Sequence, residues 1–325
     1  MPGGSDDKIL IITQEVDPHA DLMVVELRRR GVSCLRWHTA SFPLESCLTL
    51  RVNDERVEAL LRINGREIDI REIRSVWYRR PEPFQLPSAL SADEKSFAER
   101  EVKSSFSGFM QITDWFWVNH PDRIRVGASK ILQLKVAREV GLPIPRTLIT
   151  NEPEKVKPFF DECRGQMIYK ALNSGFFPSG KGCLTTPISR DHLKKLHLIR
   201  NAPGIFQEYV PKRIELRVTI IGRRVFAAEI HSQDHPETKD DWRAADVENV
   251  RHCPHALPHD IEAKCLKFID RFGLAFGAVD MILTPDGRYV FLENNPSGQF
   301  GWIEDLTRLP LTETLAEMLI AGQMI

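Results

Sequence analysis

Two β-hairpins in the last part of the chain constrain its fold more than any other feature of the sequence. In both, apolar and β-branched residues flank a short polar turn, which is the pattern of paired antiparallel strands. The hairpins are IELRVTIIGRRVFAAEIHS, which turns at Gly222-Arg223, and GAVDMILTPDGRYVFLENN, which turns at Pro285-Asp286. The sequence therefore predicts antiparallel β-structure after about residue 205.

The first part of the chain shows a different pattern, in which strands and helices alternate. An apolar strand, a helix that ends at Gly31 and a second strand follow one another at the spacing of a parallel βαβ unit. A hairpin that turns at Asn64-Gly65, another strand and a charged helix at about 91–112 come next. These stretches include KILIIT, HADLMVVELRRRG, SCLRW, VEALLRINGREIDI and IRSVWYRRPEP. They predict a small open α/β domain that ends near residue 120.

A new unit begins after this point. Ser129 can cap a helix that ends at Gly141, and prolines then lead into strands. The glycine-rich stretch NSGFFPSGKG separates two of these strands, QMIYKAL and CLTTPI. The sequence therefore predicts three domains, at 1–120, 121–205 and 206–325.

Composition argues against several classes of protein. The formal net charge of the 325 residues is -1, so no overall field attracts nucleic acid or a membrane surface. No apolar run approaches the roughly 20 residues that a bilayer span needs, and the first residues do not form a signal peptide. Six cysteines without a CxxC motif favour a cytoplasmic chain with free thiols.

One stretch imitates a metal site. His252, Cys253, His255 and His259 lie close together in the sequence, but their spacing fits no zinc pattern well. Nearby prolines favour a solvated loop instead.

The end of the second hairpin carries an unusual set of polar residues. With a two-residue turn, Asp280 lies opposite Phe291, and the period of a strand puts both on one face with Glu293 and Asn295. The two carboxylates are then diagonal neighbours, with Cβ atoms roughly 7–8 Å apart. Two carboxylates and a carboxamide oxygen are hard ligands of the kind that Mg²⁺ uses together with phosphates and water. A solvated hairpin end is the alternative.

Several residues are suited to binding phosphate. The stretch GFFPSGKG fails the P-loop pattern, because Gly182 replaces the final Ser or Thr and a strand follows instead of a helix. Its backbone N–H groups can still bind phosphate, although a flexible hairpin loop is the alternative. Lys130 and Lys170 can neutralise phosphate charge, although lysines are more often surface residues. Arg217, in an otherwise apolar strand, is expected to have an anionic partner.

The order of these motifs resembles that of the ATP-grasp superfamily over about residues 120–325. The motifs are ASKILQLKVAREVGLPIPRT, IYKAL, the glycine-rich stretch, FQEYV, ELR, GAVD and FLENNPSGQ. The chain resembles in particular the graspetide synthetases, which macrocyclise ribosomal peptides such as microviridin, in VWYRRPEPF, FAAEIHSQ, DWR and NPSGQFGWIEDLTRLPLTETLAEML. The resemblance implies an α/β (α+β) chain: an ATP-grasp fold of two α+β subdomains that clasp ATP, preceded by a small open-sheet α/β domain.

The resemblance also implies a role for each candidate residue. The phosphates of ATP would contact Lys130, Lys170, Gly180, Lys181 and Gly182. The adenine and the ribose would be bound by Gln207, Glu208, Tyr209, Val210 and Glu215. The catalytic candidates are Lys170, Arg217, which would stabilise the transferring phosphate, and Arg243, which would approach phosphate or the substrate carboxylate. Mg²⁺ would be bound by Asp280, Glu293 and Asn295. Asn294 would face away from the metal, where a local turn hydrogen bond is its simplest role.

The implied reaction is an ATP-dependent ligation. An Asp or Glu carboxylate of a precursor peptide would attack the γ-phosphate of ATP, and a Thr or Ser hydroxyl or a Lys amine would then displace phosphate from the acyl phosphate. The resemblance further implies a leader-binding region at roughly 213–272 and a homodimer. The amphipathic stretch HDIEAKCLKFIDRFG could carry the leader site, but its apolar face could equally be core.

Other interpretations remain open at this point. The same chemistry could act on a small molecule or on a protein C-terminus, as in glutamate ligases. A non-catalytic nucleotide sensor is less consistent with the complete set of candidate residues. Binding of nucleic acid is not expected, because the basic run VELRRRG is typical of a solvated helix end.

Overall fold

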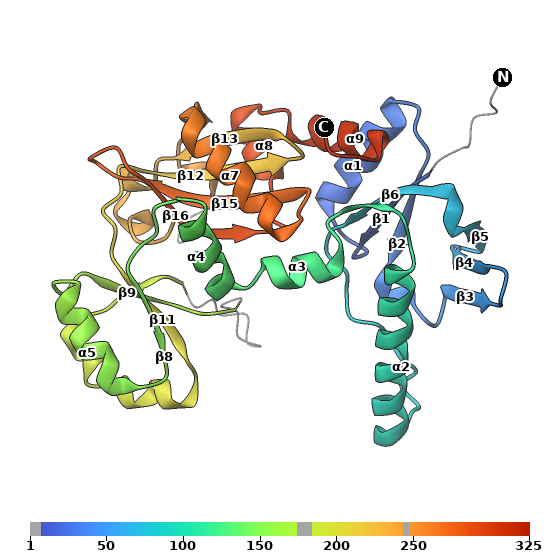
Figure 1. Cartoon of the computed structure of the whole chain (residues 1–325), viewed down its shortest axis with the longest axis horizontal. Coiled ribbons are helices and arrows are strands. Elements are labelled where there is room, and N and C mark those ends of the chain that lie inside the picture. Colours follow the sequence, from blue (N-terminus) through green and yellow to red (C-terminus); the bar gives the residue numbers. More distant parts are fainter. Residues whose placement is uncertain (1–7, 174–183, 243–246) are drawn as a thin grey trace.

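The computed structural model describes residues 8–173, 184–242 and 247–325. Among these residues the strands form four sheets, and Figure 1 shows an N-terminal lobe in blue, a central lobe in green and yellow and a C-terminal lobe in orange and red. The mixture of helices and sheets confirms the expected α/β (α+β) class. In the described part of the chain no helix is both long and apolar enough to cross a bilayer.

The main N-terminal sheet is parallel, in the order β2-β1-β6-β7. Its lobe contains β1 (Lys8–Thr13), α1 (Pro18–Arg29), β2 (Cys34–His38), β6 (Ile73–Tyr78) and β7 (Phe116–Val118). Ile9 and Ile11 enter one core and Leu10 and Ile12 another, so β1 is buried on both faces, as its continuous apolar run requires. The predicted parallel βαβ unit is confirmed.

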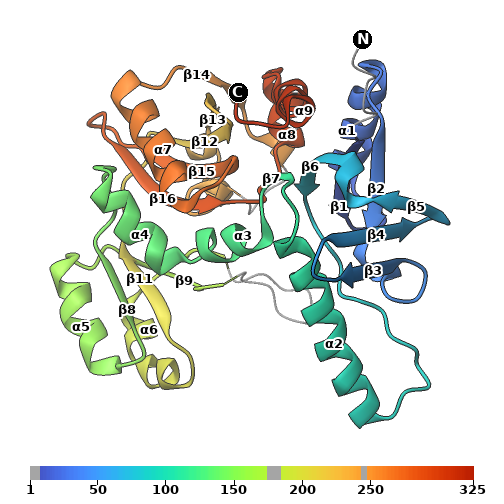
Figure 2. The ribbon, with the colours of Figure 1, turned by 45° about the vertical axis from the view of Figure 1, so that its right-hand side comes forward.

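A smaller antiparallel sheet and a long helix complete this lobe. The sheet contains β3 (Cys47–Val52), β4 (Val57–Ile63) and β5 (Arg66–Asp69). Its predicted turn at Asn64-Gly65 is confirmed, and both turn residues have the positive φ that Asn and Gly tolerate. Helix α2 (Ala92–Gln111) begins at a capping box of Ser91 and Glu94 and projects from the lobe (Figure 2).

The central lobe contains an antiparallel sheet in the order β10-β9-β11-β8. Ser129 caps α4, and Gly141 follows that helix with positive φ, as predicted. The elements from the N-terminal lobe onward are α3 (Pro121–Gly127), α4 (Lys130–Glu139), β8 (Thr147–Thr150), α5 (Pro153–Glu162), β9 (Met167–Lys170), β10 (Thr186–Pro187), α6 (Arg190–Leu193) and β11 (Gly204–Glu208). The glycine-rich stretch between β9 and β10 lies outside the described residues.

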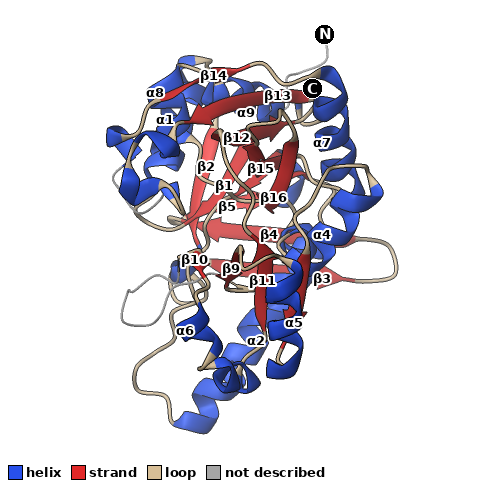
Figure 3. Cartoon of the chain, turned by 90° about the vertical axis from the view of Figure 1, so that its left-hand side faces the viewer, coloured by secondary structure: helices blue, strands red, loops and turns tan. Residues whose placement is uncertain are grey.

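The C-terminal lobe is built on a five-stranded sheet in the order β14-β13-β12-β15-β16, which Figure 3 shows above the central sheet. The predicted turn at Gly222-Arg223 is confirmed. The elements are β12 (Ile214–Ile221), β13 (Arg224–Ile230), β14 (His252–His255), α7 (His259–Phe272), β15 (Phe276–Leu283), β16 (Tyr289–Asn295), α8 (Gly301–Thr307) and α9 (Leu311–Ala321). Short 3-10 helices lie at Thr39–Ser41, Ile70–Glu72, Leu196–Asn201, Ser232–Asp234, Pro236–Thr238 and Val247–Asn249.

Two expectations for this lobe are settled by the packing. The apolar face of α7 is buried in the core against the sheet, through Ile261, Cys265, Phe268, Ile269 and Phe272, so it is not an open binding face. The expectation of a loop at 252–255 is wrong, because β14 pairs with β13 there. Pro254 is tolerated since β14 is an edge strand, whose outer side needs no backbone donor.

Asn119 joins the N-terminal lobe to the C-terminal sheet. Its side chain is buried, and its Nδ2 donates to the carbonyl groups of Phe276 (2.9 Å) and Pro296 (2.8 Å). Its Oδ1 accepts from the N–H groups of Ala275 (2.7 Å) and Phe276 (3.1 Å). One carboxamide therefore satisfies backbone groups at the start of β15 and just after the end of β16.

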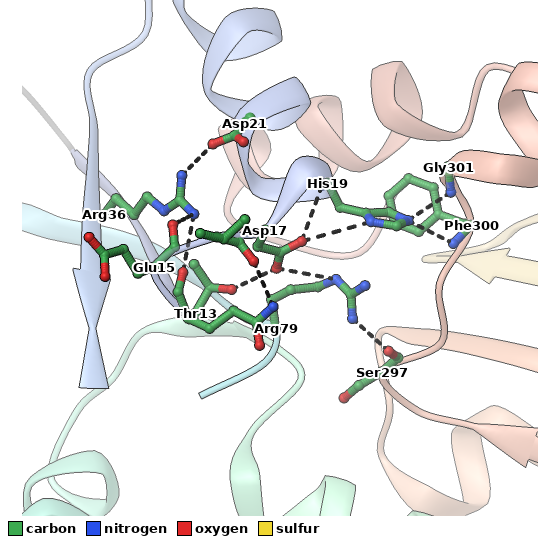
Figure 4. Close-up of polar contacts among 12 residues, drawn as sticks. Thr13, Glu15, Asp17, His19, Asp21, Arg36, Arg79, Ser297, Phe300 and Gly301 are labelled. Atoms are coloured by element: carbon green, nitrogen blue, oxygen red, sulfur yellow. Dashed lines mark hydrogen bonds and ion pairs between the residues drawn. The ribbon is translucent and has the colours of Figure 1, made fainter. Parts of the chain in front are cut away.

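A second contact between these lobes surrounds the loop after β16 (Figure 4). Arg79, 3% exposed, donates to the Ser297 carbonyl at 2.8 Å, and its Nε lies 3.9 Å from Asp17 Oδ2. Thr13 Oγ1 donates to the same Asp17 oxygen at 2.6 Å. Burial alone would raise the pKa of Asp17, but the Thr13 hydrogen bond and the Arg79 charge outweigh it and lower that pKa.

His19 holds the start of α8 in the same contact. Its Nε2 accepts from the N–H groups of Phe300 (3.2 Å) and Gly301 (2.9 Å). Burial, together with the nearby charge of Arg79, lowers the pKa of His19 to about 4. The ring is therefore neutral near pH 7, as an acceptor nitrogen must be.

We expect Asn119→Ala to lower the free energy of unfolding by about 3 kcal/mol, because the buried backbone groups of Ala275, Phe276 and Pro296 lose their partner. Urea denaturation followed by circular dichroism measures this. Asn201→Ala, which changes an exposed carboxamide, should alter the same quantity by less than about 0.5 kcal/mol. Equal values for the two variants would show that Asn119 does not join the lobes.

His19 should make stability depend on pH. The unfolded chain binds the proton near pH 6.5 and the folded chain only near pH 4, so the free energy of unfolding should fall as the pH falls through this window. The loss should approach about 3 kcal/mol, and His19→Gln, which keeps an acceptor but does not titrate, should reduce the slope. Urea midpoints of both proteins at several pH values test this. Parallel pH profiles would contradict it.

Candidate active site

A cleft of about 670 Å³ lies between the central and C-terminal lobes. Every predicted site residue that the structure describes lines it, namely Lys130, Lys170, Gln207, Glu208, Tyr209, Val210, Glu215, Arg217, Asp280, Glu293 and Asn295. The remaining candidates, Gly180, Lys181, Gly182 and Arg243, lie outside the described residues. Residues distant in the sequence thus come together at one place.

The strand register places the acidic candidates closer than the sequence predicts. Asp280 lies opposite Arg217 on β12 and opposite Glu293 on β16, while Ala278 lies opposite Asn295. The predicted pair of Asp280 with Phe291 is wrong. Because the two carboxylates are direct and not diagonal neighbours, their Cβ atoms are expected to lie about 4.5–5.5 Å apart.

Two irregularities in the hairpin explain this register. The turn has three residues and not two, because Thr284 and Arg288 close it around Gly287 at positive φ. A β-bulge then makes Leu292 an extra residue between Phe291 and Glu293. The bulge also changes the predicted face of Phe291, which packs against Phe268 in the core, while Glu293 lines the cleft.

Each carboxylate has a cationic partner. Arg217 Nε lies 3.1 Å from Asp280 Oδ1, and Lys130 Nζ lies 3.0 Å from Glu293 Oε2. The anionic partner predicted for Arg217 is therefore Asp280. Burial lowers the pKa of the Lys170 ammonium, and Glu293 opposes this effect while Lys130 adds to it. The site thus holds opposite charges close together in a partly desolvated cleft.

The residues predicted to bind adenine and ribose already have partners. Gln207 Nε2 donates to Thr147 Oγ1 at 3.0 Å, and Glu208 pairs with Arg146 at 2.7 Å. Glu215 Oε1 accepts from Lys212 Nζ at 2.7 Å and from Ser232 Oγ at 2.8 Å. The Glu208 side chain is thus already paired with Arg146. This is consistent with adenine being bound by the backbone of Glu208 and not by its side chain.

Gln133 is a site residue that the sequence analysis missed. Its buried side chain donates to the Asn294 carbonyl at 2.8 Å and accepts from the Asn294 N–H at 2.9 Å. It thereby fixes the backbone between Glu293 and Asn295. The sequence could have indicated this role, because Gln133 follows Lys130 by three residues and both therefore lie on one side of α4.

The local turn bond that the sequence suggested for Asn294 belongs to its neighbour. Asn295 Oδ1 accepts from the Ser297 N–H at 3.0 Å. The Asn294 side chain lies against Gly277, where an added Cβ would meet its Oδ1 at 2.6 Å. A larger residue at position 277 would therefore force the Asn294 side chain to shift.

Two tryptophans near Arg217 were also missed. The rings of Trp242 and Trp302 lie 4.9 Å apart, and Arg217 Cζ lies 6.0 Å from the first and 5.6 Å from the second. Aromatic rings at these distances attract a guanidinium group. Both belong to motifs, DWR and QFGW, whose aromatic residues carried no predicted role.

The chain is similar to several known proteins over most of its length. Residues 8–125 match the family model described as the MvdD pre-ATP grasp domain. The macrocyclase MdnC from Microcystis aeruginosa MRC, solved with its precursor peptide MdnA, is 32% identical, with a TM-score of 0.85 over 97% of this chain and 99% of that chain. A RiPP-associated ATP-grasp ligase from Chryseobacterium gregarium, solved with ADP and a leader and core peptide, is 30% identical, with a TM-score of 0.89 over 97% of both chains.

Two further proteins are more distantly similar. The ATP-grasp ligase PsnB, solved with a minimal precursor, Mg and ADP, is 25% identical, with a TM-score of 0.76 over 98% of this chain and 97% of that chain. A probable alpha-L-glutamate ligase from Saccharophagus degradans is 23% identical over 210 residues, which is 64% of this chain and 68% of that protein. The expected ATP-grasp fold with its preceding domain is confirmed. The chain belongs to the family of ATP-grasp RiPP macrocyclases and is an ATP-grasp ligase.

Proposed function

We propose that this ligase activates Asp or Glu side chains of a ribosomal precursor peptide as acyl phosphates and closes macrocycles. The ring bond is an ester with Thr or Ser, or an amide with Lys. The direct opposition of Asp280 and Glu293 beside Arg217 and Lys130 carries the proposal, since this arrangement suits a nucleotide phosphate chain with its cation. The likeness to MdnC and the Chryseobacterium ligase, both solved with peptides, supports a peptide substrate.

The donor atoms fit Mg²⁺ as the divalent cation. Asp280, Glu293 and Asn295 all offer oxygen atoms to the cleft. Asn295 Oδ1 accepts a hydrogen bond from Ser297 and keeps a second lone pair for a cation. Mg²⁺ bound by these residues would neutralise charge on the phosphate oxygens. PsnB was solved with Mg and ADP, which supports this cofactor pair.

When Mg²⁺ binds the carboxylates, the lysine and arginine side chains that now pair with them would pair with phosphate instead. Lys130 and Lys170 would turn to the phosphates of ATP, with the glycine-rich residues Gly180, Lys181 and Gly182 beside them. Arg217, held by the indole rings, would stabilise the phosphoryl group in transfer. Gln207, Glu208, Tyr209 and Val210 would bind adenine, Glu215 the ribose, and Arg243 the phosphate or the peptide carboxylate.

The proposed reaction has two displacements. A carboxylate oxygen of the peptide attacks the γ-phosphorus of ATP, and the bond to ADP breaks. The hydroxyl or amine then attacks the acyl carbon, phosphate leaves with the bonding pair, and the nucleophile's proton passes to solvent. Positioning and charge neutralisation by lysine and arginine supply the catalysis, with no covalent enzyme intermediate.

We also propose the three-domain division at about residues 120 and 205. The separate sheets support this division. Strand β11 crosses the second limit and pairs with the central sheet, which supports moving that limit to about 209. A leader-binding region at roughly 213–272 and a homodimer complete the proposal. Within that region the polar side of α7 remains accessible to a peptide, since its apolar side is core.

Ligation of a small molecule is the second candidate function. The match to the glutamate ligase favours it, but that match covers less of the chain than those to the macrocyclases. Incubating the protein with Mg-ATP and the peptide encoded by its nearest small neighbouring gene separates the two. Loss of one water mass per ring with ADP formation would support the cyclase. An unchanged peptide mass, with no peptide-stimulated ADP, would favour a small-molecule acceptor.

The metal assignment makes a prediction about rate. Asp280→Asn and Glu293→Gln should each lower kcat for ADP formation by about 100-fold or more, because charge on the phosphates is no longer neutralised. A coupled ADP assay at saturating Mg-ATP measures this. The matched control is Asp286→Asn, at the exposed tip of the same hairpin, which should keep the rate of the unmodified protein. Normal rates for both cleft variants would show that these residues do not bind the metal.

A further inference from the structure

A second group of metal-ligating side chains lies on β13 and β14, away from the cleft. Glu229 pairs directly with Cys253. Because side chains alternate between the two faces of a sheet, His231 lies on the same face as Glu229, and His255 lies on the same face as Cys253. All four side chains therefore share one face. The ladder continues past β13, since the His231 N–H donates to the Arg251 carbonyl at 3.0 Å. None of these side chains lines the cleft.

The donor atoms of this group converge on one point. His231 Nε2 lies 2.8 Å from Glu229 Oε2, Cys253 Sγ lies 3.3 Å from the same oxygen, and Cys253 Sγ lies 3.6 Å from His231 Nε2. Zn²⁺ binds sulfur at about 2.3 Å and nitrogen or oxygen at about 2.0–2.2 Å, so tetrahedral ligand atoms lie roughly 3.3–3.7 Å apart. To reach these separations, the contact between His231 and Glu229 must lengthen by about half an ångström and that between Cys253 and Glu229 by about a quarter of an ångström.

We propose that Glu229, His231 and Cys253 bind Zn²⁺, with water in the fourth position. A thiolate and an imidazole select a borderline-soft metal such as zinc over Mg²⁺. Binding releases the proton of the Cys253 thiol to solvent, and the resulting thiolate and carboxylate balance the charge of the ion. The proposal is independent of the function proposed for the cleft.

His255 positions the carboxylate ligand. Its Nδ1 lies 2.8 Å from Glu229 Oε1, and its Nε2 lies 2.9 Å from the Tyr289 hydroxyl. A residue that holds a ligand in this way orients it toward the metal. Arg251, which is exposed and lies 3.2 Å from His231 Nε2, is the nearby cation that must move away.

The position of the site suggests what zinc would do. His231 and Cys253 flank the segment 232–252, and the described part of that segment supplies Asp240, Asp241 and Trp242 to the cleft. Zinc would tie the two ends of this segment together and fix the edge strand β14 to the sheet. It would therefore act as a structural ion that supports the cleft from outside it.

The test is zinc binding by the full-length protein. Chelator-treated protein is titrated with Zn²⁺ in excess Mg²⁺ against a chromophoric competitor, and bound metal is measured by mass spectrometry after gel filtration. We expect one zinc ion per chain. Cys253→Ser should weaken binding by about 100-fold or more and His255→Gln by about 10-fold, whereas Cys34→Ser, at a distant free thiol, should have no effect.

A second measurement needs no variant. Cobalt(II) added to the metal-free wild-type protein should give thiolate-to-cobalt charge-transfer absorption and the visible bands of a tetrahedral ion. The proposal is overturned if the wild-type protein binds zinc no more tightly than Cys253→Ser does, or if cobalt shows no thiolate band. It is also overturned if Asp280→Asn, and not Cys253→Ser, abolishes zinc binding, because the ion would then occupy the cleft.

Discussion

Repulsion between two carboxylates is the constraint on which the cleft depends. Asp280 and Glu293 face each other on adjacent strands, where like charges destabilise a sheet, and Arg217 and Lys130 offset that cost. A cation between the carboxylates would take over the same task and release the two side chains for phosphate.

Three side chains donate hydrogen bonds to the backbone at the end of β16 and in the loop that follows it. Gln133 of the central lobe fixes the backbone at Asn294, Asn119 fixes the carbonyl of Pro296, and Arg79 fixes that of Ser297. All three donors are buried, so the bonds are protected from water. The strand end is therefore fixed by buried hydrogen bonds although it borders an open cleft, and the proposed metal site would need ligands that are held in place in this way.

Local patterns predicted local structure well, and the tertiary register poorly. The turns at Asn64-Gly65 and Gly222-Arg223 and the cap at Ser129 depend on a few neighbouring residues, and all three are confirmed. The set of cleft residues followed from motif order. The register of β15 with β16 could not be predicted in this way. It depends on a bulge at Leu292 and on a longer turn, and both follow from packing across the sheet. The roles of Gln133 and Asn119 and the strand at 252–255 were not predicted for a similar reason. Their partners lie far away in the sequence, so no local pattern indicates them.

The contacts of the N-terminal lobe bear on how such ligases can be recombined. Asn119, Arg79 and His19 reach across a domain border to the loop that follows the acidic strand. The N-terminal lobe therefore cannot be exchanged freely with that of a relative. A chimaera would inherit its cleft residues from one parent and the contacts that support them from another, and compatibility at this border would decide whether the hybrid protein folds and works.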